Sequence, residues 1–283
     1  MGYRCFEVTE FDRVAHIRLN RPDELNSMVR EFWTELPEIV NGISDEGRSR
    51  AIVISSTGKH FCAGMDLSVF TGGDDKAGML DQPAGELGRS NSRTRQGALL
   101  LQDTFTCLER ARMPVLAAIQ GGCVGGAVDL VTACDMRYAT AEAFFVVQEI
   151  NIGMTADVGT LQRLPKLIPE GVARELAYTG RRMPAERALE VGLINELFDS
   201  HDAMLDGVLA IAAEIAVKSP LAIWGTKETV NYARDHTVAD SLAQIATWQA
   251  GMFQPDDMLE AFQAKAEGRE PTFDDLGPTS RGL

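Results

Sequence analysis

The segment GGCVGGAVD, residues 121–129, combines a glycine-rich turn with an acidic residue in an apolar context. Backbone N–H groups at the start of a helix stabilise negative charge that develops nearby. Asp129 follows Gly126 by three residues, so both lie on one helix face, and an aspartate is costly to bury unless it is paired or functional. The segment indicates a pocket that joins a carboxylate to an oxyanion-binding N–H. A tight strand-to-helix turn with a dipole-stabilised aspartate is the simpler interpretation.

Two acidic residues further along the chain, Glu149 and Asp157, are also candidates for chemistry. Glu149 ends the apolar run FFVVQ, and Asp157 precedes VGTLQRL, which we expect to be a helix. Taken alone, Glu149 is equally an ordinary charge at the end of a strand, and Asp157 is an ordinary N-cap. Capping does not exclude catalysis. Asp129, Glu149 and Asp157 are therefore candidates for general acid–base chemistry.

Other chemical motifs fail. The glycines do not form GxGxxG, and although Gly121 and Gly126 fit GxxxxG, Ala127 stands where a P-loop requires lysine. His60 and Cys62 resemble a nucleophile pair only by proximity, because residues of this spacing are common by chance. The five cysteines form no CxxC pattern, so we predict neither a disulfide framework nor a metal site.

Charge and composition restrict the classes of partner. The chain has 283 residues, 45% of them hydrophobic, and a formal net charge of −14. Such a chain can bury a core without staples. The negative charge opposes sequence-independent binding to nucleic acids and docking on anionic membranes, which both need basic surface. We therefore expect no nucleic-acid partner and no membrane partner.

Targeting signals are not found in the sequence. The start, MGYRCFEV, has no apolar signal core, and Phe6 stands where myristoylation requires serine or threonine. The last residues, SRGL, differ from the peroxisomal SKL signal, and no run of 18 apolar residues exists. Without a disulfide framework, these features predict a cytoplasmic protein.

The hydrophobic pattern predicts alternating strands and helices. We expect strands at 3–9, 13–19, 51–56, 114–120, 136–140 and 144–148, and helices at about 29–43, 96–112 and 127–133. The glycine-rich segment 71–95 is predicted to be a mobile loop. Strand–strand–helix units of this kind indicate an α/β fold with parallel pairing.

The character of the chain changes near residue 200, after which only helical patterns occur. Apolar stripes pass through Leu205 and Val208, through Val238 and Leu242, and through Met258 and its neighbours. We therefore divide the chain into a core, residues 1–200, and a C-terminal helical oligomerisation region, residues 201–283. The final segment, 270–283, is expected to be frayed.

Four segments together resemble the crotonase, or enoyl-CoA hydratase/isomerase, superfamily. They are NRPDELNSM at 20–28, FCAGMDL at 61–67, GGCVGGAVDLVTACDMRYAT at 121–140 and VQEINIGMTADVGTLQRLP at 147–165. The resemblance extends over roughly residues 5–270. It implies a spiral ββα catalytic core, a C-terminal trimerisation region and an acyl-CoA thioester substrate.

The resemblance also implies how the thioester is held. By position, the N–H groups of Met65 and Gly126 form the oxyanion hole, which needs no particular side chain at position 65. Two such donors stabilise the enolate oxygen that forms when the α-proton of a thioester is removed. Ala63 and Asp66, in the same segment as Met65, are the expected substrate-binding residues.

The three acids bear on the reaction. In typical hydratases of this family, glutamates stand at the positions of Asp129 and Glu149, and glycine is usual at position 157. An acid at all three positions resembles the Δ3,5-Δ2,4-dienoyl-CoA isomerase branch. The resemblance makes Glu149 and Asp157 the proton-transfer pair and gives Asp129 an orienting role. The alternatives are an enoyl-CoA hydratase or another acyl-CoA isomerase of the family. A non-catalytic scaffold or an RNA-binding protein of this fold is a third alternative, which the charge of −14 and the intact acids oppose.

The remaining expectations concern partners. Coenzyme A is part of the substrate, so no separate cofactor is predicted. Phe262 and Lys265, in AFQAK, match a family pair that reaches the CoA of a neighbouring subunit. The resemblance therefore predicts a homotrimer or a dimer of trimers.

Overall fold

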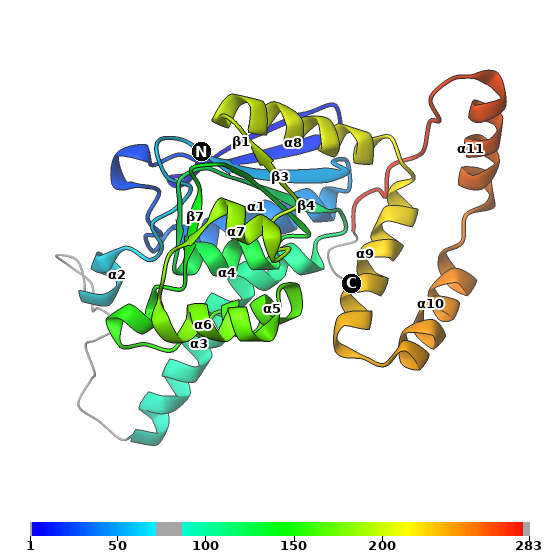
Figure 1. Cartoon of the computed structure of the whole chain (residues 1–283). Helices are drawn as coiled ribbons and strands as arrows, with labels where there is room; N and C mark the ends of the chain where they lie inside the picture. The colour runs from blue at the N-terminus through cyan, green and yellow to red at the C-terminus, as the bar shows by residue number, and fades with distance from the viewer. Residues whose placement is uncertain (1, 72–86, 280–283) are drawn as a thin grey trace.

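The chain has an α/β architecture in a computed structural model that describes residues 2–71 and 87–279 (Figure 1). The described part of the main sheet contains β1 (Phe6–Phe11), β2 (Val14–Leu19), β3 (Ala51–Ser56), β4 (Val115–Ile119), β6 (Met136–Thr140) and β9 (Glu196–Phe198), in that order across the sheet. β1 and β2 are antiparallel, and each later pairing is parallel. Parallel neighbours need long crossovers, which the helices supply. The predicted fold class is confirmed.

A second, smaller sheet contains the strands that follow β4 and β6 in the chain. It consists, among the described residues, of β5 (Gly122–Val124), β7 (Phe144–Val146) and β8 (Met183–Pro184). Cys62 adds an isolated parallel bridge to Cys123 at its edge. The chain thus passes from β4 to β5, and from β6 to β7, before it enters a helix. This repetition is the expected ββα unit.

Helices bury both faces of the main sheet. On one face, α1 (Phe32–Glu46), α3 (Leu87–Arg110) and α4 (Gly126–Ala133) form the larger core with alternate strand residues such as Ile17, Ile52 and Ala117. Side chains alternate between the faces of a strand, so Val53 and Leu116 point the other way. Those residues pack against α8 (His201–Ala216).

By packing, α8 belongs with the sheet, although the sequence analysis placed it in the C-terminal helical region. Its residues Met204, Val208 and Ala212 are fully buried in the second core cluster. The remaining short elements of the core are η1 (Pro22–Glu24), α2 (Leu67–Thr71), η2 (Glu149–Ile152), α5 (Thr160–Leu167), α6 (Glu170–Thr179) and α7 (Ala185–Glu190). They surround the second sheet, where the candidate site lies.

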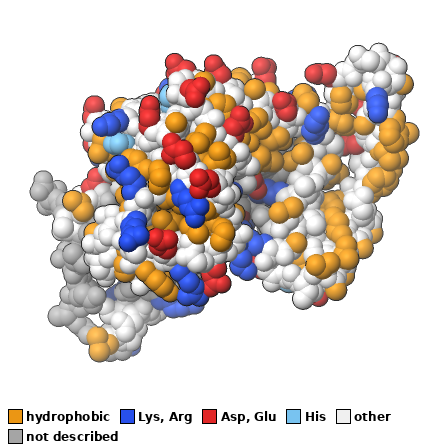
Figure 2. Space-filling model, viewed as in Figure 1, with side chains coloured by type: hydrophobic (Ala, Val, Ile, Leu, Met, Phe, Trp, Pro, Cys, Tyr) orange, Lys and Arg blue, Asp and Glu red, His pale blue; other side chains and the backbone are white. Residues whose placement is uncertain are grey.

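Three helices extend away from this core at the right of Figure 1: α9 (Pro220–Asp235), α10 (Val238–Met252) and α11 (Pro255–Glu267). Trp224 and Trp248 join α9 to α10 with an edge-to-face contact between ring centroids 5.0 Å apart. Figure 2 shows hydrophobic side chains along these helices, and large exposed ones include Val238, Leu242, Leu259 and Phe262. This part of the chain therefore presents apolar surface to solvent.

The described helices differ from membrane-spanning helices in length or composition. None of them alone is long and apolar enough to cross a bilayer. α8 and α9 together meet the criteria of length and composition, but they are bent by 108°.

The tail after α11 returns to the core, so the prediction that residues 270–283 fray is wrong for the described residues up to 279. Phe273 is buried, and the guanidinium of Arg50 donates to the carbonyl of Phe273 and to the carboxylate of Asp275, at 2.6 and 2.8 Å. Arg112 also donates to the carbonyl of Gly277. Long-range hydrogen bonds, which no local sequence pattern indicates, hold residues 270–279 against the core as a strap.

The predicted elements agree with the structure most closely in the strands. The strand at 51–56 has the predicted limits. The helix expected from 96 begins earlier, at Leu87, so residues 87–95 of the predicted loop are helical. The rest of that predicted loop, residues 72–86, lies outside the described residues.

Candidate active site

A cavity of about 760 Å³ lies where the second sheet meets the loops that precede α4, α5 and α2. Its apolar lining includes Leu25, Trp33, Val124, Ile152, Met154 and Val158. The predicted residues Ala63, Met65, Asp66, Gly126, Glu149 and Asp157 all line it. Segments that are almost a hundred residues apart in sequence thus meet around one space of a size suited to a small-molecule ligand.

The backbone at Met65 is held so that its N–H is free. Met28 donates its N–H to the carbonyl of Gly64, at 2.8 Å, and accepts from the N–H of Asp66, at 3.1 Å. This parallel bridge uses the groups on either side of Met65, so the N–H of Met65 points away from Met28. Within the described residues, no acceptor binds it.

Gly126 supplies the second free N–H. It is the first residue of α4, where an N–H has no acceptor within the helix. Gly125, immediately before it, has φ of 55°, which favours glycine. A Cβ built on Gly64 would lie 2.7 Å from the carbonyl of Val124 and 3.6 Å from the nitrogen of Gly126. Only glycine allows this close approach, which brings the two donor segments together.

Asp129 is completely buried behind the cavity and does not line it. Its Oδ1 accepts the N–H of Thr160 at 2.5 Å, and its Oδ2 has no hydrogen-bond partner among the described residues. Burial, and after it the nearby carboxylate of Glu149, raise the pKa of Asp129 to about 7, although the hydrogen bond from Thr160 and the charge of Arg163 lower it. Asp129 therefore titrates near neutral pH.

Glu149 stands between Asp129 and the cavity. It begins η2, and its Oε1 would lie 3.4 Å from a Cβ on Gly125, beside the free N–H of Gly126. Burial raises the pKa of Glu149; backbone hydrogen bonds oppose this, and the charge of Asp157 adds to it. Its Oε2 is buried without a partner in the described structure. A carboxyl of this kind can both take and give a proton.

Asp157 is not an N-cap, which corrects the simpler interpretation of its position. Helix α5 begins at Thr160, its N-cap is Gly159, and no side chain of the N-cap residue closes it. Asp129 takes the helix N–H instead, from a different helix. Asp157 is exposed and lines the cavity. Its backbone carbonyl accepts a hydrogen bond from the side chain of Gln102 at 2.8 Å.

The structure gives Ala63 and Asp66 different tasks. Ala63 lines the cavity and donates its N–H to the carbonyl of Leu25. The carboxylate of Asp66 accepts from the hydroxyl of Ser27 and from Ser68, whose backbone and side chain both donate. These hydrogen bonds from Ser68 and Ser27 lower the pKa of Asp66. Asp66 therefore fixes the loop that presents the N–H of Met65.

His60 and Cys62 do not form a nucleophilic pair. Nδ1 of His60 accepts the N–H of Gly122 at 2.9 Å. Cys62 is fully buried, and burial raises the pKa of its thiol to about 12. A thiol of this kind remains protonated at neutral pH and is not a nucleophile. Both residues shape the turn into β5.

Phe262 and Lys265 lie on α11 and do not line the cavity of the same chain. Phe262 is 63% exposed, and Lys265 is exposed. Their predicted contact with the CoA of a neighbouring subunit remains a prediction.

Several residues of the site were missed by sequence reasoning. Thr160 supplies the N–H that binds Asp129, and Trp33 contributes an aromatic wall. Arg182 lies at the cavity with its guanidinium carbon 3.5 Å from the ring centroid of Phe144. A backbone donor, a core-type tryptophan and a surface-type arginine carry no chemical signature in sequence, so only the structure identifies them.

Comparison with characterised proteins identifies similar chains over almost the whole length. A human mitochondrial Δ(3,5)-Δ(2,4)-dienoyl-CoA isomerase is 45% identical over 272 residues, which cover 95% of this chain and 81% of the relative. A peroxisomal protein of the same name from Arabidopsis thaliana is 38% identical and covers 92% of both chains.

The names of these relatives contradict the predicted cytoplasmic location. The human relative is named mitochondrial, and the Arabidopsis relative is named peroxisomal. The prediction rested on the absence of recognisable signals, and the residues of the catalytic core carry no information about the compartment in which a protein works.

Fold and sequence lead to the same family. A crystal structure of an enoyl-CoA hydratase from Bacillus anthracis superimposes with a TM-score of 0.84 at 29% identity, over 95% of this chain and 99% of that one. The profile of the enoyl-CoA hydratase/isomerase family matches residues 9–276. The chain therefore belongs to the enoyl-CoA hydratase/isomerase family, the crotonase superfamily.

Proposed function

We propose that this protein is a Δ3,5-Δ2,4-dienoyl-CoA isomerase, which moves two conjugated double bonds of a fatty acyl thioester during β-oxidation. The observation that carries the proposal is the position of Asp157, which lines the same cavity as Glu149 and does not cap α5. A hydratase needs an acid pair around one water, whereas this reaction needs acids at two distant carbons. The names of the similar dienoyl-CoA isomerases support the same reaction.

The proposed reaction transfers one proton overall. One member of the Glu149–Asp157 pair takes the proton from C2 of a 3,5-dienoyl thioester, and the electron pair spreads over the carbonyl oxygen and the chain to C6. The N–H groups of Met65 and Gly126 bind the oxygen as it becomes negative, which removing one donor weakens by about 3 kcal/mol. The other acid protonates C6, and double bonds then stand at C2 and C4.

Asp129 acts in this scheme through Glu149. It lies behind the cavity and has no access to the substrate, but its charge and that of Glu149 oppose each other's ionisation. Two close carboxyl groups in a buried site titrate as a pair, so one of them tends to stay protonated near neutral pH. Asp129 is therefore proposed as a positioning and tuning residue.

The reaction as written gains and loses no electrons. Proton transfer between carbons needs no redox group. The two backbone N–H donors stabilise the negative charge on the oxygen, as a Lewis acid would. We therefore propose that the enzyme works without a cofactor and that coenzyme A enters only as part of the substrate.

Turnover of two substrates tests the proposal. The protein is assayed with a 3,5-dienoyl-CoA and with a trans-2-enoyl-CoA, and we expect the first to be converted faster. Asp157→Asn removes the distal acid, so isomerase turnover falls by about 10²–10⁴-fold. The melting temperature should not change, because Asp157 does not cap α5.

The matched control is Asp202→Asn, which replaces a surface aspartate whose side chain is 99% exposed. It is expected to keep full activity. Faster turnover of the enoyl-CoA by the wild type, or full isomerase activity in Asp157→Asn, would favour the hydratase alternative.

We further propose that the chain assembles as a homotrimer or a dimer of trimers through the apolar surface of α9–α11. Exposed side chains such as Leu242, Leu259 and Phe262 support it, because apolar patches of this kind usually mark interfaces. In such an assembly Phe262 and Lys265 are free to reach the ligand of a neighbour. Light scattering tests this: a particle of one chain mass, 30.8 kDa, at micromolar concentration would contradict it.

A further inference from the structure

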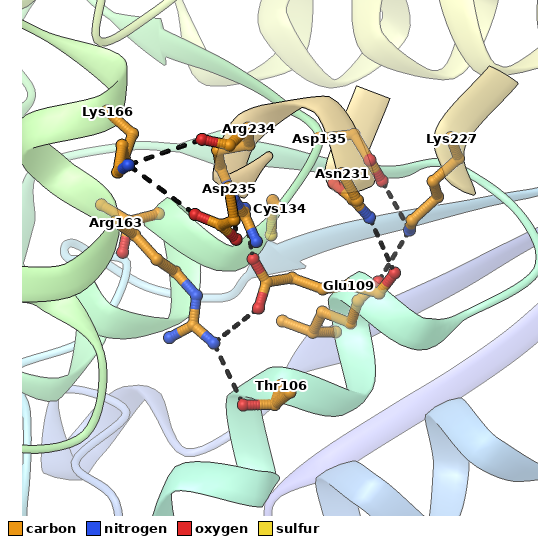
Figure 3. A network of polar contacts seen from close by, with 12 residues as sticks. Thr106, Glu109, Cys134, Asp135, Arg163, Lys166, Lys227, Asn231, Arg234 and Asp235 are labelled. Atoms are coloured by element: carbon orange, nitrogen blue, oxygen red, sulfur yellow. Dashed lines mark hydrogen bonds and ion pairs between the residues drawn. The ribbon is translucent and has the colours of Figure 1, made fainter. Parts of the chain in front are cut away.

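Three charged residues, Arg163, Glu109 and Arg234, form a network of ion pairs (Figure 3), and Arg163 of this triad lies against Val158 and Gly159, next to Asp157. Glu109 on α3 accepts from Arg163 on α5 at 2.6 Å through Oε2, and from Arg234 on α9 at 2.6 Å through Oε1. The side chains of Arg163 and Glu109 are only 10% and 13% exposed. Removing such a pair from water costs free energy that can exceed the gain from its attraction, so stability alone does not explain this arrangement.

The two arginines of this triad stabilise the charged form of Glu109. Burial opposes ionisation of Glu109, but the hydrogen bonds and charges of Arg163 and Arg234 outweigh it and hold the pKa of Glu109 below its usual value. Arg163 also donates to the hydroxyl of Thr106 at 3.1 Å. The guanidinium of Arg163 is therefore fixed from the side of α3.

The other side of this guanidinium supports residues 157–160. Its Nη1 lies 3.5 Å from the carbonyl of Val158. Gly159 has φ of 139°, and a Cβ at Gly159 would lie 1.8 Å from Nη1 and 3.0 Å from Cζ of Arg163. The guanidinium thus occupies the space that any larger residue at position 159 would need.

Residues 157–160 influence two of the three acids, because Asp157 belongs to this segment and Thr160 donates a hydrogen bond to Asp129. Asp157, at the start of the segment, lines the cavity, and the N–H of Thr160, at its end, donates to Asp129. A shift of the segment would therefore move Asp157 relative to Glu149 and loosen Asp129 at once.

We propose that Arg163, held by Glu109, is a positioning residue that sets the positions of Asp157 and Asp129 in the active site. The proposal rests on the isomerase function proposed above. Because Arg234 comes from α9, the same triad ties the helical projection to the loop of Asp157.

Arg163 acts on Asp129 through charge as well as position. The charged or titratable groups that face Asp129 are Glu149 from η2, the thiol of Cys123 from β5 and Arg163 from α5, with Glu109 of α3 paired to Arg163. Arg163 lowers the pKa of Asp129, against burial and Glu149. Loss of its charge should move the acid limb of the pH–rate profile to higher pH.

Two substitutions separate position from charge. Arg163→Lys keeps the charge but loses the planar fork that contacts Thr106, Glu109 and Gly159 together. It should lower kcat by about 10- to 100-fold, since a small misplacement of an acid has effects of that size, and leave the acid limb in place. Arg163→Met should lower kcat similarly and also shift the limb upward. Glu109→Gln provides a third variant if Arg163→Met does not fold.

The matched control is Arg174→Met, which breaks an exposed pair with Glu170 on α6. It should retain the kcat and the pH profile of the wild type. Unchanged kcat in folded Arg163→Lys and Arg163→Met, or an unshifted limb in Arg163→Met, would overturn the inference.

If the wild-type protein shows no isomerase turnover, the proposed function is contradicted, and the present inference is tested by a second measurement. This measurement is the free energy of unfolding as a function of pH, for Arg163→Met and for the wild type. The free energy of unfolding of Arg163→Met should continue to decrease up to a higher pH than that of the wild type, because Asp129 in the variant loses its proton at a higher pH. Parallel curves for the two proteins would overturn the positioning and charge role of Arg163.

Discussion

Replacing Asp129 with asparagine should stabilise the protein at high pH while it impairs catalysis. Asparagine keeps an oxygen that accepts the N–H of Thr160, the one hydrogen bond that Asp129 makes through Oδ1. It removes the charge that burial disfavours and gives the other end of the side chain an N–H₂ group next to Glu149. The substitution thus tests the energetic consequence of burying this acid separately from its hydrogen bond.

The magnitude follows from linkage. The pKa of Asp129 is raised from 3.8 to about 7, so the folded protein binds the proton more tightly than the unfolded chain does. The stability that this provides is complete below about pH 4, decreases as pH rises, and is lost above the folded pKa near 7. At about 1.4 kcal/mol per unit, the loss approaches an upper limit of about 4 kcal/mol.

Denaturant unfolding at fixed protein concentration, from pH 4.5 to pH 9, measures this difference. The stability of the wild type should fall over that range by a few kcal/mol more than that of Asp129→Asn. Turnover should decline in the variant because Glu149 loses its charged neighbour. Asp129→Ala is the control. Unlike asparagine, alanine leaves the N–H of Thr160 without its acceptor, so this variant should be less stable than the wild type at every pH. Parallel pH curves for wild type and Asp129→Asn would refute the reasoning.

Three other measurements check the remaining structural conclusions. Gly126→Pro removes one oxyanion donor at the first position of α4, where proline suits a helix, so turnover should fall by about 10²–10³-fold in a folded protein; a Gly126→Ala comparison keeps the donor. Arg50→Met, measured by denaturant unfolding, should cost about 3 kcal/mol, since the buried guanidinium holds the strap at Asp275 and Phe273; a change near zero would contradict this. The five buried thiols should resist a thiol reagent in the native protein and all react in guanidinium; rapid native labelling would contradict their burial.

Short motifs in the sequence predicted the candidate site, and the resemblance to the family gave its residues their roles, which stay predictions. The N–H of Gly126 is free because this residue begins α4, a local feature, whereas the N–H of Met65 is oriented by the bridge to Met28, which is distant in sequence. Alternation of apolar residues likewise located the buried strand at 51–56 with its observed limits. Patterns of this kind reflect interactions between neighbours along the chain.

Tertiary structure decided which groups meet. Asp157 precedes a helix and had the sequence of an N-cap, yet Asp129, on another helix, binds the first N–H of α5. The tail that seemed frayed is fixed by Arg50, more than two hundred residues away. Nothing within a window of neighbouring residues encodes either contact.

The same limit applies to energies and to the positioning residue. Arg163 has the sequence environment of an ordinary amphipathic helix, and its role depends on Glu109 and on the space above Gly159. The raised pKa of Asp129 depends on how completely the folded chain excludes water around it. Burial and through-space charge are properties of packing, so the sequence determined the kinds of chemical groups available, and only the fold determined their environment.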